Sequence, residues 1–327
     1  MTQTAAVTDP PTKFAYGDLV SLIIFGYNQA EIIRPIIMAA LAQDYVNLEI
    51  VLSDNGSADE TFAVMTEIAD AYKGPHTIRL NRNEPPGRGF IGHVNQAFDL
   101  CRGALIVYNP GDDVSEPHRV ARLSQAAAHT QALLIHSDVT ECGPDGLSLD
   151  KVWSVQPNLE GKTSQDAALM FALCIGATCA WRHELMDRFG PIEEAGTYDD
   201  LVFYFRALLA GRVAHVPEPL MRYRTGIGLS HSAELGAGAT RADRLAKLAR
   251  ILTLNLSTMR QRRRDADAVG VTDIVSLLDP EIESTAYQLR LIQEPGFDRA
   301  QRFSSWRGFR VARRMRRRLN KTLTHVT

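Results

Sequence analysis

Polar side chains follow three of the apolar runs in the first part of this chain. Tyr27 and Asn28 come after the first run and Asp54 after the second, while Asp112 and Asp113 come after a later one. Two adjacent carboxylates repel each other unless a cation or a proton lies between them. Mg²⁺ and Mn²⁺ prefer carboxylate oxygens, and often share them with a substrate phosphate. The pattern therefore favours a phosphate-binding site that uses a divalent cation, although Asp54 alone is equally well explained as a turn residue.

The apolar runs have the composition of strands that are buried on both faces of a parallel sheet. Helical patterns separate them, and Ser57 and Glu60 predict a capping box before the second helix. The predicted strands are residues 20–25, 48–53, 77–80, 104–109 and 133–138, and the helices between them include residues 32–42 and 91–101. This alternation predicts an α/β fold with a mostly parallel, Rossmann-like sheet and helices on both faces. Ligands of such sheets bind beyond the carboxyl ends of the strands, where the polar residues lie.

Beyond the fifth strand, the alternation of strands and helices ends. An amphipathic helix begins with Asp199 and Asp200. Pro217 and Pro219 divide residues 213–223 into two short predicted strands, because proline cannot donate to a β ladder. The remainder of the chain has a helical pattern and predicts a helical C-terminal extension.

The order and spacing of the motifs resemble glycosyltransferase family 2, an inverting family with the GT-A fold. Where the family has P-x-Y-N after its first strand, this chain has FGYN at 25–28, and where it has D-x-G-S-x-D-x-T, this chain has DNGSADET at 54–61. The Gly-rich stretch before N-x-A corresponds to 87–97, and the D-x-D-D element corresponds to PGDD at 110–113. The resemblance covers residues 19–230, roughly two thirds of the chain.

Three further motifs of the family follow in the same order. A spaced G-R-G pattern corresponds to Gly176, Arg182 and Gly190. An E-D pair that opens a helix with a later Arg corresponds to Asp199-Asp200 and Arg206. A Y-R pair with a later Ser corresponds to Tyr223-Arg224 and Ser230. The agreement in order and spacing carries the resemblance, since no single motif is specific to the family.

The resemblance implies a single displacement, with inversion, in which a sugar leaves a nucleoside diphosphate. Asp200 would be the general base that takes the proton of the acceptor hydroxyl, and Asp199 beside it would raise its pKa by like-charge repulsion. Asp112 and Asp113 would hold Mn²⁺ or Mg²⁺ against the diphosphate. Without the resemblance, Asp199 and Asp200 are equally well explained as acidic residues at a helix N-terminus.

The same resemblance assigns residues that bind the nucleotide. Tyr27 would stack on the base and Asp54 would accept a hydrogen bond from a base N–H, with Asn28 beside them, while Arg88 and Arg224 would contact the diphosphate. The resemblance implies a nucleotide-diphosphate sugar as donor, with UDP the expected nucleotide. It implies a saccharide or lipid-linked acceptor in the assembly of a cell-surface polysaccharide or glycolipid.

Two residues depart from the pattern of the family. Pro110 replaces the first Asp of D-x-D, so that one oxygen ligand is missing, and Asp199 is one methylene shorter than the Glu of the E-D pair. Pro110 keeps an alternative open, in which the chain is a catalytically silent GT-A module that binds nucleotide or a protein partner.

A competing motif lies at residues 87–92, where GRGFIG matches the G-x-G-x-x-G fingerprint of dinucleotide-binding enzymes. In that fingerprint the first Gly directly follows a strand, whereas here Pro85 and Pro86 precede it and the motif falls on the third crossover. The chain has neither a P-loop sequence nor the G-x-S-x-G elbow of serine hydrolases. These three enzyme classes are therefore disfavoured.

The composition is that of an ordinary globular protein, with 45% hydrophobic and 23% charged residues. The four cysteines form no C-x-x-C pair and predict free thiols in a reducing compartment. The first residues lack a signal-peptide pattern, and the longest apolar run, 167–181, is shorter than the roughly 20 residues of a spanning helix. We therefore expect a cytoplasmic protein.

A strongly basic segment contrasts with the rest of the chain. Residues 299–327 carry nine Arg, one Lys and no acid, so the net charge of −2 hides a net −12 on the other residues. On a helical wheel most of these arginines lie opposite Phe309, Val311 and Met315. A basic amphipathic helix of this kind is typical of contact with an anionic membrane surface, and equally of a solvated helix that packs on the body or of a disordered basic tail. The family resemblance favours the membrane and implies its inner face. Binding to nucleic acid is the less favoured interpretation.

The expected organisation has five segments. They are an N-terminal tail (1–18), a nucleotide-sugar-binding α/β half (19–138), an acceptor-binding half (139–230), a helical extension (231–298) and a basic amphipathic tail (299–327).

Overall fold

The computed structural model describes residues 13–226 and 240–294. The chain divides into two compact units, one formed by Met1–Ala195 and Asp199–His231, the other by Gly196–Tyr198 and Ser232–Thr327. Each unit is described below by itself. Ser230 and the basic tail at 299–327 lie outside the described residues, and so do the expectations attached to them.

The first unit contains, within its described residues, a nine-stranded sheet of order β3-β2-β1-β4-β8-β6-β9-β5, with β7 paired to β6. The strands are β1 (Val20–Gly26), β2 (Leu48–Asp54), β3 (Thr77–Arg82), β4 (Leu105–Pro110), β5 (Val114–Ser115), β6 (Leu134–Cys142), β7 (Ser148–Trp153), β8 (Ala180–Arg182) and β9 (Val213–Arg224). Strands β3, β2, β1 and β4 are parallel neighbours. The predicted, mostly parallel sheet is therefore confirmed.

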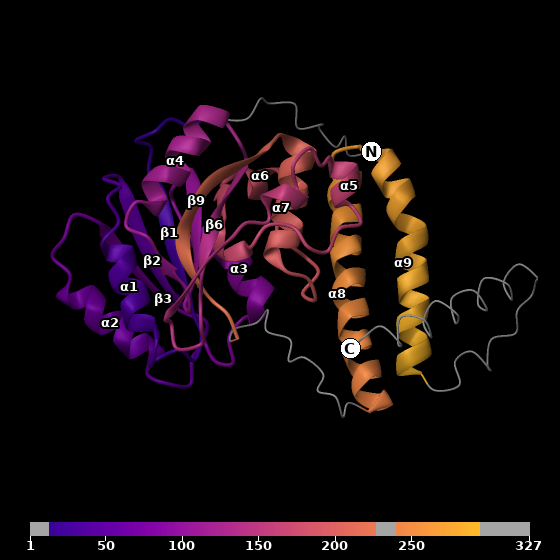
Figure 1. The fold of residues 1–327 in the computed structure, drawn as a ribbon, viewed down its shortest axis with the longest axis horizontal. Coiled ribbons are helices and arrows are strands. Elements are labelled where there is room, and N and C mark those ends of the chain that lie inside the picture. The colour runs from indigo at the N-terminus through magenta and orange to yellow at the C-terminus, as the bar shows by residue number, and fades with distance from the viewer. Residues whose placement is uncertain (1–12, 227–239, 295–327) are drawn as a thin grey trace, which may run out of the picture. The chain divides into compact units, whose positions relative to one another are not determined.

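Helices cover both faces of this sheet (Figure 1). Their bounds are α1 (Ile33–Leu41), α2 (Thr61–Ala71), α3 (Gly89–Leu100), α4 (Arg119–Thr130), α5 (Ser164–Ala167), α6 (Glu184–Phe189) and α7 (Asp199–Ala210), with short 3₁₀ turns η1 (Gln156–Asn158) and η2 (Gly176–Thr178). Aliphatic side chains of β1, β2 and β4 pack against α1 and α4. On the other face, Trp181 of β8 packs against Phe203 of α7 and Phe98 of α3, with ring centroids 4.5 and 6.1 Å apart.

The predicted capping box before α2 is wrong. The helix begins at Thr61, and Glu60 precedes it with no side-chain cap. Ser57 instead donates its amide and its hydroxyl to Asp54, and the amide of Thr61 is bound by Asp59 over 3.0 Å. The Ser57 side chain is therefore used to shape the loop after β2 rather than to start the helix.

The division of residues 213–223 into two strands is also wrong, because β9 runs unbroken from Val213 to Arg224. Its pairing with β6 shifts register on both sides of Asp138, between the Ser137–Val216 and Val139–Met221 pairs. The shift leaves Pro217 and Pro219 in an irregular part of the ladder, where their missing N–H groups do not break the strand.

The second unit consists, in its described part, of the two long helices α8 (Arg241–Ala268) and α9 (Thr272–Gln293). Leu248 and Leu252 of α8 are buried against leucines and an isoleucine of α9. Thr240 and Asp243 form a capping box that starts α8. The predicted helical extension is confirmed. None of the helices within 13–226 and 240–294 has the length and apolar character needed to cross a membrane.

Candidate active site

The carboxyl ends of four parallel strands lie at one level of the sheet. Asp54 at the end of β2 is in register with Gly26 of β1 on one side and with Arg82 of β3 on the other. Phe25 of β1 is in register with Pro110, the last residue of β4. The loops that carry Tyr27, Asp54 and Asp112 therefore leave the sheet at the same edge, as the sequence predicts.

The loops after β1 and β2 are tied to each other around Asn28. Its amide donates to the hydroxyl of Ser57 over 2.9 Å, and its Oδ1 accepts the amide of Ala58 over 2.9 Å. Asn28 adopts φ +52°, a left-handed conformation that Asn tolerates better than most residues. Tyr27 beside it has 52% of its surface exposed, which leaves the ring free to contact a flat ligand.

Asp54 is fully buried at the end of β2. Its Oδ2 accepts the amide of Ser57 over 3.0 Å, its Oδ1 accepts the Ser57 hydroxyl, and Arg82 Nε lies 3.6 Å away. The carboxylate therefore organises its own loop, and a nucleotide N–H would have to use one of its remaining lone pairs.

Arg88 begins helix α3 next to the same loop. Its amide donates to Asn55 Oδ1 over 3.0 Å, and its Nε donates to Asn83 Oδ1 over 3.3 Å. Gly87 before it has φ +85°, and a Cβ there would stand 2.0 Å from the carbonyl oxygen of Asn55. The Gly-rich stretch thus packs against the loop after β2 and presents the guanidinium of Arg88 near the strand ends.

Asp112 and Asp113 lie in the turn between β4 and β5. Asp113 is buried, and its Oδ1 accepts the amide of Arg224 from the end of β9 over 2.8 Å. Burial raises the pKa of Asp112, and burial together with the charge of Asp112 raises the pKa of Asp113 well above its usual range. A cation beside the pair would relieve this cost, since it favours the ionised forms.

Asp199 and Asp200 form the first turn of α7, as predicted. Asp199 is buried, and its Oδ2 has no hydrogen-bond partner among the described residues. Burial and the charge of Asp200 raise the pKa of Asp199 to about 8. On the other side, a Cβ on Gly176 of η2 would stand 3.4 Å from the Cβ of Asp200. Gly176 of η2 therefore lies next to the side chain of Asp200.

Tyr108 of β4 relates the two acidic pairs to each other. Burial raises the pKa of its phenol well above the usual value, and so do, in decreasing order, the charges of Asp199, Asp112, Asp200 and Asp113. Electrostatic effects of this kind fall off steeply with distance. The charges of both acidic pairs therefore act on one buried phenol. Asp54 lies on β2, which β1 separates from β4.

Arg119 is a buried residue of the site that sequence reasoning missed. Its Nη1 donates to Ser115 Oγ over 2.9 Å, and its Nη2 donates to the carbonyl oxygens of Tyr108 and Ala177 over 2.8 and 2.7 Å. It thereby joins the Asp112–Asp113 turn to η2, which lies against Asp200. The available signal was its spacing, since Arg119 precedes the buried residues Leu123 and Ala127 at helical intervals of four.

The burial of Asp199 predicts a pH-dependent stability. Because the folded state holds its proton up to about pH 8 and the unfolded state releases it near pH 3.8, the wild type should lose stability as the pH rises between these values. Asp199→Asn has no proton to lose. Its advantage in free energy of unfolding should therefore grow with pH, at a limiting slope of about 1.4 kcal/mol per pH unit.

Urea denaturation at pH 5, 6, 7 and 8 measures this slope for both proteins. Asp99→Asn, at an exposed position of α3, is the control and should follow the wild type. A constant difference between Asp199→Asn and the wild type across the range would contradict the raised pKa.

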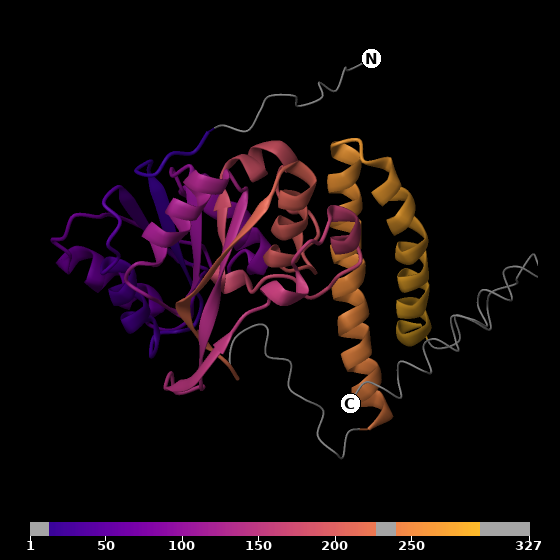
Figure 2. The ribbon, with the colours of Figure 1, turned by 45° about the horizontal axis from the view of Figure 1, so that its top comes forward.

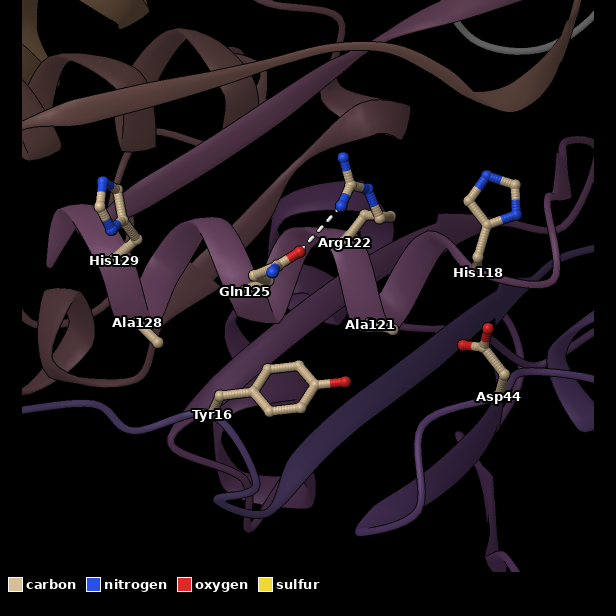
Figure 3. Close-up of a pocket in the computed structure, with 8 residues that line it drawn as sticks. All are labelled: Tyr16, Asp44, His118, Ala121, Arg122, Gln125, Ala128 and His129. Atoms are coloured by element: carbon tan, nitrogen blue, oxygen red, sulfur yellow. Dashed lines mark hydrogen bonds between the residues drawn. The ribbon is translucent and has the colours of Figure 1, made fainter.

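A separate hollow of about 680 Å³ lies along the outer side of α4 (Figure 3). It is lined by Tyr16 and Asp44, by residues of α4 that include Arg122 and His129, and by His118 just before this helix. Arg122 there donates to Gln125 over 2.8 Å and pairs with Glu218. None of the predicted site residues lines this hollow.

A sequence model described as glycosyltransferase-like family 2 matches residues 17–241. The chain belongs to glycosyltransferase family 2. An uncharacterized glycosyltransferase of Nostoc sp. is 26% identical to it over 230 residues, which are 67% of this chain and 68% of that protein. The predicted membership of the family is thereby confirmed.

Shorter matches connect this family 2 glycosyltransferase to named relatives. The succinoglycan biosynthesis protein ExoO of Rhizobium meliloti is 33% identical over 130 residues, 40% of this chain and 36% of that protein. The UDP-Glc:α-D-GlcNAc-diphosphoundecaprenol β-1,3-glucosyltransferase WfaP of Escherichia coli is 32% identical over 96 residues, 29% of this chain and 36% of that protein. The chain thus matches about a third of the length of each of these two relatives.

The fold of the glycosyltransferase resembles that of Staphylococcus aureus TarS 1–349, solved in complex with UDP-GlcNAc. The two share 14% identity with a TM-score of 0.53, over 87% of this chain and 76% of that one. The predicted GT-A fold is therefore confirmed. Among the described residues of the glycosyltransferase, no three His, Cys, Asp or Glu side chains group as metal ligands. Its four cysteines are free thiols, as predicted.

Proposed function

We propose that this glycosyltransferase moves a sugar, with inversion, from a nucleotide-diphosphate sugar to a saccharide or a lipid-linked saccharide. A UDP-sugar is the proposed donor. The single observation that carries the proposal is the bridge that Arg119 makes between the β4–β5 segment, which carries Asp112 and Asp113, and the η2 turn, which lies against Asp200. One acidic pair sits at the strand ends, where a donor binds, and the other opens a helix beside it.

Asp200 is the proposed general base. Its Oδ1 accepts the amide of Leu201 over 2.7 Å, which orients the carboxylate at the start of α7. It takes the proton of the acceptor hydroxyl while that oxygen bonds to the anomeric carbon. The bond from this carbon to the diphosphate breaks, and the nucleoside diphosphate leaves with the electron pair. Because the oxygen enters opposite the leaving group, the anomeric configuration inverts. Because burial lets Asp199 keep its proton up to about pH 8, Asp199 adds no second negative charge beside Asp200 below that pH.

Asp112 and Asp113 are the proposed holders of a divalent cation, Mn²⁺ or Mg²⁺. A buried and a half-buried carboxylate, both with raised pKa values, fit such an ion, with phosphate oxygens completing its ligands in place of the Asp that Pro110 replaces. When bound, the cation neutralises charge on the leaving diphosphate. Arg88 and Arg224 would add charge-assisted hydrogen bonds to the same phosphates.

The exposed ring of Tyr27 is proposed to stack on the nucleotide base, beside Asn28 and Asp54. For the acceptor, the names of the relatives supply the support: one acts on a diphosphoundecaprenol-linked GlcNAc and another serves succinoglycan biosynthesis. We propose a role in cell-surface polysaccharide or glycolipid assembly at the inner face of the membrane, with residues 299–327 as the contact to anionic lipid.

Release of nucleoside diphosphate from a panel of UDP-, GDP- and dTDP-sugars tests the proposal. With Mn²⁺ or Mg²⁺ at least one donor should turn over, excess EDTA should lower the rate tenfold or more, and added Mn²⁺ should restore it. NMR of the product should show an inverted anomeric centre. A turnover rate that EDTA leaves unchanged would contradict the proposed use of a divalent cation. A product with retained anomeric configuration would contradict the proposed inverting mechanism. No turnover, together with no nucleotide binding at millimolar concentration, would favour a silent module.

A further inference from the structure

Beyond Asp138, strands β7, β6 and β9 carry two adjacent rows of side chains on one face. Trp153, Val139 and Met221 are in register and form the first row. Lys151, Glu141 and Tyr223 are in register two residues further along each strand and form the second row. Side chains two residues apart on a strand point to the same face, so both rows share one surface. Figure 2 shows the β6–β7 hairpin reaching beyond the rest of the sheet.

This surface continues directly into the candidate active site. Val139 and Met221 are buried against Ala177 of η2, and Ile175 and Tyr223 pack on the same cluster. The residue between Ile175 and Ala177 is Gly176, which lies against Asp200.

The second connection runs along β9. Tyr223 directly precedes Arg224, whose amide is bound by Asp113 over 2.8 Å. The two rows are thus joined through η2 to the proposed base and through β9 to the proposed cation site.

Two aromatic rings stand at the open side of this surface. The rings of Trp153 and Tyr223 have centroids 6.4 Å apart and an interplanar angle of 53°. Trp153 has 43% of its surface exposed, although it is among the largest apolar side chains of the first unit. Exposed apolar surface of this kind, rimmed by polar groups, commonly marks a ligand groove.

The polar groups at the rim are Glu141 and Lys151. The Lys151 ammonium lies 2.8 Å from the Glu141 carboxylate. In the sheet, Glu141 of β6 stands between Lys151 of β7 and Tyr223 of β9. Lys151 is exposed and Glu141 half-buried, so both can exchange this contact for hydrogen bonds to a ligand. One carboxylate and one ammonium supply acceptors and donors for several hydroxyl groups.

We propose that Trp153 and Tyr223 form the binding platform for a sugar ring of the acceptor, with Glu141 and Lys151 bound to its hydroxyl groups. This inference rests on the proposed function and names where its acceptor binds. A pyranose has a face of C–H groups and a rim of hydroxyls, which match an aromatic surface and a polar rim respectively. A surface that contacts a lipid bilayer carries apolar and basic residues, and the carboxylate of Glu141 at the rim opposes that interpretation.

The experiment uses the full chain and two rates. The first is the release of nucleoside diphosphate without acceptor, which reports donor binding and chemistry alone. The second is the added rate with octyl β-glucoside, octyl β-galactoside or octyl N-acetyl-β-glucosaminide, each below its micellar concentration. Trp153→Ala should raise the KM of the accepted glycoside at least tenfold and leave the donor KM and the acceptor-free rate within twofold. Trp153→Phe should keep the KM within about threefold, because it retains a ring.

Val152→Ala is the matched control, since Val152 is 58% exposed on the opposite face of the same strand. It should leave both rates unchanged. The platform is overturned if Trp153→Ala changes the glycoside KM less than twofold, if it lowers both rates equally, or if an active wild type accepts none of the glycosides. If Trp153→Ala loses binding to anionic vesicles while its glycoside KM is unchanged, the surface binds lipid, and the proposed sugar platform is overturned as well. No turnover of any donor, with or without a glycoside, together with no nucleotide binding, would instead overturn the proposed function.

Discussion

Asp200→Asn is expected to lower kcat about a thousandfold and to leave nucleotide binding unchanged. Asn has the size of Asp and can keep the contact with the amide of Leu201, but it cannot take a proton from the acceptor hydroxyl. General-base catalysis contributes roughly 10²–10⁴-fold to a rate, so the loss should fall in this range. The Kd of UDP or GDP in the presence of Mn²⁺, measured by calorimetry, should stay within about twofold, since Asp200 is proposed to act on the acceptor.

A carboxylate in the first turn of another helix provides the control. Asp187 in the first turn of α6 is exposed, and Asp187→Asn should transfer sugar at the wild-type rate. An Asp200→Asn protein that transfers sugar at the parental rate would remove Asp200 as the base. A parallel loss of nucleotide binding would mean that this carboxylate supports the donor site instead.

Arg119→Met is expected to lower the free energy of unfolding by about 3 kcal/mol, the scale seen when one member of a buried polar network is removed. The substitution keeps much of the volume but leaves the carbonyl oxygens of Tyr108 and Ala177 without their donor. It also removes the positive charge nearest to buried Asp113 on α4. Arg119→Lys should recover only part of the loss, because one ammonium cannot reproduce the planar fork of the guanidinium.

Urea denaturation followed by circular dichroism measures this effect, and Arg122→Met is the matched control. Arg122 lies one turn further along α4, on the solvent side, where it pairs with Glu218. Its replacement should leave the denaturation midpoint close to that of the wild type, since exposed ion pairs contribute little. Equal midpoints for the Arg119→Met and wild-type proteins would show that the buried network does not stabilise the fold.

The parts of the fold that follow from local pattern were predictable. Strands β1, β2 and β4 are continuous apolar runs, and α7 starts at Asp199 because two acids precede an amphipathic stretch. The strand-end positions of Tyr27, Asp54 and Asp112 follow from the parallel topology alone. Their position at one edge of the sheet could therefore be predicted from the sequence.

Contacts between distant segments could not be predicted in this way. Arg119 bonds to Ala177, 58 residues away, and only the folded chain shows that this arginine is buried. Ser57 had two competing partners, and Asp54 three residues earlier prevailed over the start of α2. The prolines of β9 looked like a break because the register shift that absorbs them is visible only in the pairing of β9 with β6.

Helix α7 and strand β9 follow each other with only Gly211 and Arg212 between them, and the pair runs from the acids at its beginning to the amide that Asp113 binds at its end. Under the proposed function, this stretch sets the distance between the base Asp200 and the cation site at Asp113. Inserting even one residue into its two-residue bend should misalign the reaction for every substrate alike. Changes of preference for the acceptor sugar are therefore best engineered by exchanging the hairpin between β6 and β7, which lies outside the α7–β9 stretch.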